Sequence, residues 1–216
     1  MKFFVLALGL AGNAMLVLPA TAQNTDLASP FYGGLALGIF TINDSRATTS
    51  ATLINSLGGT ANVSQDTSAY MGRVFGGKHL DQSLSLELGY HQSAAVAQKI
   101  TGVASNSAAY TGATSLGVSG WDYSIVLRPH RALHHTGPFL RLGGHYLTVS
   151  GSATLTATSA MASASSYGGS GFLWGAGYET PIKESFDLRM EYLGFRNVAG
   201  KDNTTDNFCV AVVKHF

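Results

Sequence analysis

The sequence is poor in charge and in cysteine. Charged residues make up 12% of its 216 residues, about half the share of an average soluble domain, which leaves too few to cover a water-exposed surface. The single cysteine, Cys209, excludes an internal disulfide framework, and we interpret it as a small buried residue. No basic patch is visible, so a nucleic-acid partner is disfavoured.

Beyond residue 18 the sequence also lacks any apolar run long enough for a membrane-spanning helix. The first 22 residues have the pattern of a secretory signal peptide, since Lys2 precedes the apolar run 3–18 and Ala20 and Ala22 form a small-x-small site. We predict cleavage after Ala22; the alternative is a retained anchor helix, for which the run is at the short end. Loss of Lys2 leaves 12 of 13 basic residues against 12 acidic ones, so the mature chain is formally neutral.

What the sequence does contain is an alternation of apolar and polar residues at period two, which is typical of half-buried strands. The alternation is cleanest where Leu84, Leu86 and Leu88 are interleaved with Ser85 and Glu87. After a lead-in at residues 23–30, we predict eight strands within one domain, residues 31–216, at 31–43, 69–78, 83–92, 121–128, 139–146, 172–179, 187–192 and 207–216.

The second of these strands, residues 69–78, is the least regular. Met71 and Phe75 share the parity of Arg73, so the face that carries a charge also carries two large apolar side chains. The register of this strand therefore stays open.

Parity alone does not decide which face meets water, because a soluble barrel would alternate in the same way. The connections at 44–68, 93–115, 151–168 and 196–206 are long, whereas those at 79–82, 129–137 and 181–185 are short. Long outer loops and short periplasmic turns are typical of bacterial membrane barrels. A lipocalin-like soluble barrel is the alternative, but it leaves this difference in length unexplained.

Aromatic residues of the apolar face gather at the ends of the strands. Next to the long connections lie Tyr70, Tyr90, Trp121, Tyr123, Tyr146, Phe172, Trp174, Tyr192 and Phe208, and at the opposite rim lie Phe31, Tyr178 and Phe216. Two aromatic girdles around an apolar band indicate a bilayer, although strand-favouring aromatics could also fall there by chance. We therefore predict an all-β fold, an eight-stranded antiparallel up-and-down transmembrane β-barrel in the bacterial outer membrane.

Four segments carry a resemblance to a known family: residues 84–90 (LSLELGY), 139–146 (FLRLGGHY), 175–179 (GAGYE) and the terminal Phe216. They resemble the small eight-stranded outer-membrane proteins of the OmpA membrane-domain, opacity and OmpX/Ail types, and the likeness covers essentially the whole mature chain. The resemblance implies a porin-family envelope protein without a cofactor. It also implies contact with outer-membrane lipid and lipopolysaccharide, and with the barrel-assembly machinery during biogenesis.

The resemblance further implies an assembly signal near the C-terminus. The alternating residues Phe208, Val210, Val212 and Phe216 are similar to the family's recognition signal. Lys214 stands where an apolar or aromatic residue is usual, and we interpret it as snorkelling to the inner interface.

The interior of an eight-stranded barrel is just wide enough for side chains, which disfavours a wide diffusion pore. The charged residues of the inner parity are Arg73, Glu87, Arg141, Glu179, Arg189 and Glu191. Because an unpaired buried charge costs several kcal/mol, we predict that they form a plugging salt-bridge network to which Glu87 and Arg141 both belong. A narrow ion-conducting channel is the alternative.

The long connections are rich in Ser, Thr, Ala, Gly and Asn, and exposed connections of this kind make surface contacts. Members of the resembling family bind host matrix, complement regulators or phage, whereas others support envelope integrity. We therefore expect a structural envelope protein, a surface adhesin or interaction protein, or both. The sequence identifies neither a ligand nor an oligomeric state.

A lipid A modifying acyl hydrolase is a further alternative. His91 and Ser93 lie two apart on one strand face and are similar to the His-x-Ser of lipid A deacylases, in which the serine needs a base within reach. No Asn follows Ser93, and no carboxylate lies at the expected short distance downstream. We therefore expect no catalytic site.

Three histidines, His130, His134 and His135, fall in one short turn beside Arg128 and Arg131. No cysteine or acid completes a zinc site there. We expect a basic turn near the inner-leaflet headgroups and no metal.

Overall fold

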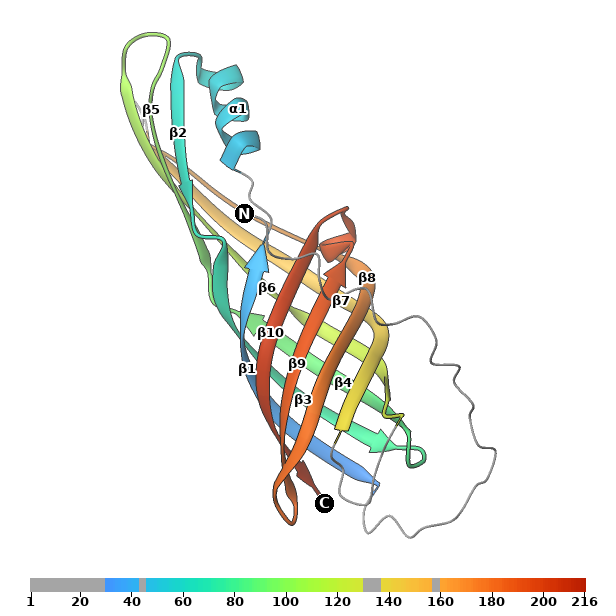
Figure 1. Ribbon diagram of the computed structural model, residues 1–216. Coiled ribbons are helices and arrows are strands. Elements are labelled where there is room, and N and C mark those ends of the chain that lie inside the picture. The colour runs from blue at the N-terminus through green and yellow to red at the C-terminus, as the bar shows by residue number, and fades with distance from the viewer. Residues whose placement is uncertain (1–29, 43–45, 130–136, 157–159) are drawn as a thin grey trace, which may run out of the picture.

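The computed structural model describes residues 30–42, 46–129, 137–156 and 160–216, which form strands and two short helical segments (Figure 1). The elements are β1 Phe31–Ile42, α1 Arg46–Leu57, β2 Thr60–Gln65, β3 Ser68–His79, β4 Leu84–Ser93, β5 Val96–Val103, β6 Ala109–Leu127, β7 Gly137–Thr156, β8 Ala160–Lys183, β9 Phe186–Arg196, the 3-10 helix η1 Val198–Gly200 and β10 Thr204–His215. The signal peptide and most of the lead-in lie outside the described residues, so cleavage after Ala22 stays a prediction.

Eight of the strands close into a barrel. They pair antiparallel in the order β1-β3-β4-β6-β7-β8-β9-β10, and the pairing of β10 with β1 completes the ring. The predicted eight-stranded up-and-down barrel is confirmed. The register of β3, which the sequence left open, sets Arg73 opposite Ala36 on one side and His91 on the other.

The barrel carries its charges inside and its apolar side chains outside. On β4, Leu86 and Leu88 are 47% and 54% exposed, whereas Glu87 between them is 3% exposed. The arrangement recurs around the ring, for instance at Leu142 and Arg141 on β7. A soluble barrel would place these residues the other way round, so the outer wall is built to meet lipid.

The long connections, which we expected to be outer loops, are mostly helix and strand. The first forms α1 and β2, the second forms β5, and β6, β7 and β8 run on for 19, 20 and 24 residues in total. A tilted strand crosses a bilayer in about 9–11 residues, so roughly half of each long strand lies beyond the membrane. We define the outer sheet as β2, β5 and residues 109–118 of β6, 149–156 of β7 and 160–167 of β8.

The outer sheet has strand order β2-β5-β6-β7-β8 and lies at the end of the molecule opposite to the C-terminus (Figure 1). It has a small core of its own, in which Val63, Ile100 and Tyr110 are buried and Leu53 of α1 packs against them. The Tyr110 hydroxyl donates to the carbonyl oxygen of Thr60 at 2.9 Å. Among the described residues, no helix combines the length and hydrophobicity needed to cross a membrane.

Candidate functional site

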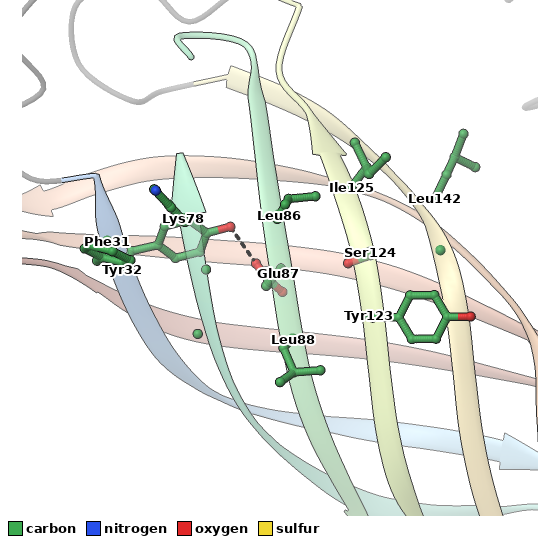
Figure 2. A pocket seen from close by; sticks show the side chains of 13 residues that line it. Phe31, Tyr32, Lys78, Leu86, Glu87, Leu88, Tyr123, Ser124, Ile125 and Leu142 are labelled. Atoms are coloured by element: carbon green, nitrogen blue, oxygen red, sulfur yellow. Dashed lines mark hydrogen bonds between the residues drawn. The ribbon is translucent and has the colours of Figure 1, made fainter. Parts of the chain in front are cut away.

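The centre of the barrel interior is the carboxylate of Glu87. It accepts contacts from three guanidinium groups, with Arg141 Nη1 at 2.6 Å, Arg189 Nη1 at 2.7 Å and Arg73 Nη2 at 2.8 Å. The Tyr32 hydroxyl donates to the same carboxylate at 3.0 Å. Figure 2 shows this hydrogen bond, with the side chains of Leu86 and Leu88 on the opposite side of the strand.

Two further carboxylates bind the arginines that contact Glu87. Arg141 Nε and Nη2 donate to the two oxygens of Glu191 at 2.5 and 3.2 Å. Arg73 Nε and Nη2 likewise donate to the two oxygens of Asp122 at 3.0 and 2.7 Å. Paired geometry of this kind gives the strongest side-chain contacts that an arginine makes.

Towards the end of the barrel with the short turns, Glu179 is the shared acceptor. Arg189 Nε lies 3.1 Å and Arg128 Nη2 lies 3.2 Å from Glu179 Oε2. Next to it, His215 Nε2 lies 2.8 Å from Asp187 Oδ2. The guanidinium carbons of Arg128 and Arg189 also lie 5.8 and 5.6 Å from the centre of the Tyr32 ring.

The structure thus brings all six residues of the expected lumen network together. It adds three that the sequence analysis left out of the network, namely Asp122, Arg128 and Asp187. All three share the inner parity of their strands, and this signal could have found them. Among the described buried residues, four arginines (Arg73, Arg128, Arg141, Arg189) face five carboxylates (Glu87, Asp122, Glu179, Asp187, Glu191).

The other half of the lumen, towards the outer sheet, is filled mainly by apolar side chains, among which His91, His145 and Asn207 are also buried. Met71, Leu147, Leu193 and Phe195 are buried in one cluster that also includes Phe40. Two layers therefore close the interior in series, an ionic one near the short turns and an apolar one near the outer sheet. We call these the inner network and the outer plug.

The histidine and serine considered as a catalytic pair do not contact each other. His91 Nε2 lies 2.6 Å from Asp122 Oδ2, and Ser93 Oγ accepts from the backbone N–H of Val118 at 2.8 Å. Both side chains are buried inside the barrel, away from the lipid that a deacylase would have to reach. The geometry gives Ser93 no general base.

Most of the aromatic residues of the predicted outer girdle are exposed on the outer wall, and several lie side by side in register. Tyr90 is opposite Trp121, which is opposite Tyr146, and the Tyr90 and Trp121 rings are 5.0 Å apart. On the far side of the barrel Tyr192 is opposite Phe208. The remaining members of the set, which lie on the same wall, are Tyr70, Tyr123, Phe172 and Trp174, with Phe31, Tyr178 and Phe216 at the other rim.

The residues of the predicted assembly signal share this wall. Phe208, Val210 and Val212 alternate outward along β10, and the backbone N–H of Phe216 donates to the carbonyl oxygen of Phe31. The Lys214 ammonium lies 5.1 Å from the centre of the Phe216 ring. Recognition of these residues during assembly stays a prediction.

One group of side chains in the described residues has a composition that could hold a metal. Glu179, Asp187 and His215 each offer one ligand atom, and these atoms lie within 4.8 Å of one another. Arg128 and Arg189 already bind Glu179, so the carboxylate has cationic partners without a metal. The turn with His130, His134 and His135 lies outside the described residues, and its role stays a prediction.

A closed barrel with an apolar outer wall and a charged interior defines an integral outer-membrane protein. The chain matches the family model of the outer membrane protein beta-barrel domain over residues 9–216, and it therefore belongs to this family. It is a protein of the bacterial outer membrane. No match is found among the curated proteins.

Several solved structures are similar to this chain. Ail of Yersinia pestis, in complex with the heparin analogue sucrose octasulfate, has 10% identity and a TM-score of 0.45, over 86% of this chain and 99% of that chain. Neisserial surface protein A (NspA) has 13% identity and a TM-score of 0.41 over 87% and 98%. OprG from Pseudomonas aeruginosa has 9% identity and a TM-score of 0.42 over 87% and 98%. Similarity at this level carries no information on activity.

Proposed function

We propose that the protein is a surface interaction protein, in which the barrel is the membrane anchor and the outer sheet contacts a partner outside the cell. The observation that carries this proposal is the continuity of β6, β7 and β8 from the barrel into the outer sheet. A binding surface on regular strands is held more rigidly than one on loops. The barrel and the sheet thus form one stiff unit.

The surface chemistry of the outer sheet supports a polar, weakly charged partner. Residues 46–65, 94–118 and 149–168 contain only two charged side chains, Arg46 and Lys99. Exposed hydroxyl groups instead line up across neighbouring strands. Ser115 Oγ lies 2.9 Å from Ser152 Oγ, and Ser150 Oγ lies 3.3 Å from Ser166 Oγ. Rows of hydroxyls suit a partner that is itself rich in hydrogen-bonding groups, such as a glycan or an extended peptide.

The closed interior disfavours the alternative of a channel. Ions would have to pass both the inner network, centred on Glu87, and the outer plug around Leu147 and Phe195. The interior has the features of a structural core, which leaves the outer sheet as the surface for contact with other molecules. An envelope protein with no dedicated partner is the remaining alternative.

The proposal is tested with bacteria that carry either the wild-type protein or a variant with a shortened outer sheet. The backbone N–H of Ile42 donates to the carbonyl oxygen of Thr67 at 3.0 Å, so a short turn can replace residues 43–66 without moving the barrel. A finer variant replaces Ser115, Ser150, Ser152 and Ser166 by alanine. Binding of the cells to immobilised matrix proteins, glycosaminoglycans and host cells is measured.

We expect the wild type to bind at least one of these surfaces and both variants to bind more weakly. The control is Ser185→Ala in the exposed turn between β8 and β9, at the opposite end of the barrel. Unboiled and boiled gel electrophoresis of outer-membrane fractions verifies that every variant is folded and inserted. Absence of binding by the wild type, or equal binding by all variants, would contradict the proposal.

A further inference from the structure

A cavity of about 260 Å³ opens where the outer sheet leaves the barrel. β1 ends at Ile42 and β10 begins at Thr204, whereas β6, β7 and β8 continue beyond this level into the outer sheet. The barrel wall is therefore taller on the side of β6, β7 and β8 than on the side of β1 and β10. The tall side of the cavity is formed by Val118, Val149 and Tyr167, which lie opposite one another in register on β6, β7 and β8. We call this cavity the outer cup.

The outer cup has an apolar base and a closed floor. Phe40, which is 1% exposed, lines the cavity, and it belongs to the same buried cluster as Leu147 and Phe195 of the outer plug. Beneath the plug lies the inner network around Glu87. A molecule that enters the cup from outside therefore reaches a dead end, so the cup is a place for binding and not a passage.

The segment around η1 forms another side of the cup and is held in an unusual conformation. Val198 lines the cavity, and its neighbours Asn197 and Ala199 have positive φ angles of 58° and 55°. Asparagine often adopts such angles, but they are uncommon for alanine, and strained backbone of this kind clusters at ligand clamps. The segment is fixed from one side by Gly169, where an added Cβ would lie 2.5 Å from the backbone nitrogen of Gly200.

The lining indicates the chemistry of the ligand. No charged side chain is among the described residues that line the cup, and Lys201, whose ammonium lies 4.0 Å from the centre of the Tyr167 ring, is not part of the lining, so an ionised ligand would lose hydration inside the cup. Tyr167 offers an aromatic ring, and Asn203, next to the start of β10, offers a polar side chain at one edge. A dry cavity of about 150 Å³ is large enough to hold benzene, so about 260 Å³ suits a slightly larger molecule.

From these observations we propose that the outer cup is a binding site for an uncharged aromatic molecule of one or two rings with one hydrogen-bonding group. The rings of the ligand contact Tyr167, Leu116 and Ile42 above the buried Phe40, and its polar group faces the β10 edge of the cup. This site is separate from the exposed serine rows of the outer sheet. It therefore goes beyond the proposed surface interaction and does not depend on it.

The test uses the full-length protein refolded in lipid nanodiscs, with indole and 1-naphthol as the probes. Saturation-transfer NMR measures binding to the wild type, to Val149→Phe, which fills the cup, and to Val210→Phe as the matched control. Val210 carries the same side chain on the lipid-facing wall of β10. Because the probes partition into lipid equally in all three samples, differences between the variants report the cup alone.

We expect saturable binding of at least one probe to the wild type and to Val210→Phe, with an affinity lower by roughly tenfold or more in Val149→Phe. Leu116→Phe, which enters the same cavity from β6, serves if Val149→Phe fails to show a heat-dependent gel shift. Equal affinities in wild type and filled variants, or only non-saturable partitioning, would overturn the proposal. The variant with Ser115, Ser150, Ser152 and Ser166 replaced by alanine leaves the lining of the cup unchanged, so it should bind the probes like the wild type, and failure here and failure of the proposed function are distinguishable.

Discussion

The two halves of the lumen close the same barrel by different physical means. Along β9 the inward residues change from Asp187, Arg189 and Glu191 to Leu193 and Phe195 within a single strand. Arg189 and Glu191 contact partners of opposite charge and Asp187 contacts the imidazole of His215, whereas Leu193 and Phe195 pack in the outer plug. The difference shows that an eight-stranded barrel can be filled either by ion pairs or by apolar packing.

The difference also shows what each half contributes. A buried ion pair adds little stability compared with a well-packed apolar core, but loss of one partner is very costly because the other charge is left buried. The inner network therefore tolerates few substitutions, and it favours a single register of the strands. The outer plug excludes water at the end of the barrel that carries the outer sheet.

The largest expected effect is the loss of Glu87, whose carboxylate contacts Arg73, Arg141 and Arg189. Glu87→Ala leaves three guanidinium groups without their shared acceptor, and we expect the free energy of unfolding to fall by about 3–5 kcal/mol. Urea unfolding in lipid vesicles, followed by tryptophan fluorescence, measures the change. The control Glu184→Ala, in an exposed turn, should stay within about 0.5 kcal/mol; a Glu87→Ala midpoint equal to that of this control would refute the inner network.

A substitution in the outer plug should cost less, and for a different reason. Leu147 is 1% exposed in the apolar cluster, so Leu147→Ala removes packing and leaves a cavity, at a cost of about 3 kcal/mol. Leu147→Met, which keeps the volume, should restore most of the loss. The same urea assay measures both, and a larger loss in Leu147→Met than in Leu147→Ala would contradict an outer plug held by packing.

The two layers in series also predict how the barrel conducts ions. Glu87→Gln weakens only the inner network, and Leu147→Ala leaves a cavity only in the outer plug. Each single variant should therefore conduct almost no ion current across a planar bilayer. The double variant should show small, brief conductance steps. Large steady steps in the wild type would show that neither layer seals the lumen.

The smallest expected effect lies on the outer wall. Trp121 makes ring contact with Tyr90 and lies opposite Tyr146, with its side chain exposed to lipid. Trp121→Ala should lower the free energy of unfolding by about 1 kcal/mol, the size of an aromatic pair contact. Trp121→Phe, which retains a ring, should recover part of this loss in the same assay. A loss in the free energy of unfolding as large as that of Glu87→Ala would contradict our expectation that the interior contributes more to stability than the outer wall.

The barrel strands could be predicted from the sequence because each strand meets two different environments. Leu86 and Glu87 differ sharply in polarity, and alternation reveals which residues share a face. The outer sheet could not be predicted in the same way, since residues 160–167 are mostly Ala and Ser with no apolar face. Residues 96–103 did carry a weaker signal, in which buried Val96 and Ile100 alternate with exposed residues.

The sequence predicted which residues face the lumen, but not which of them form ion pairs with one another. Parity placed Arg73 and Glu87 in the lumen, and the structure gives them a direct contact. The role of Asp122 as the second partner of Arg73 depends on how neighbouring strands are staggered, which the sequence does not state. The change from the inner network to the outer plug along β9 is visible in the sequence once the lumen-facing residues are read in order.

The central claim is that lipid covers the apolar wall while charged and apolar side chains seal the interior. Nitroxide labels at Leu88 and Ile125, introduced one at a time into a Cys209→Ala background, test this claim in lipid vesicles by comparing collisions with oxygen and with a water-soluble nickel complex. We predict that both labels collide more with oxygen, as in hydrocarbon. Greater accessibility to the nickel complex at both positions would contradict the account.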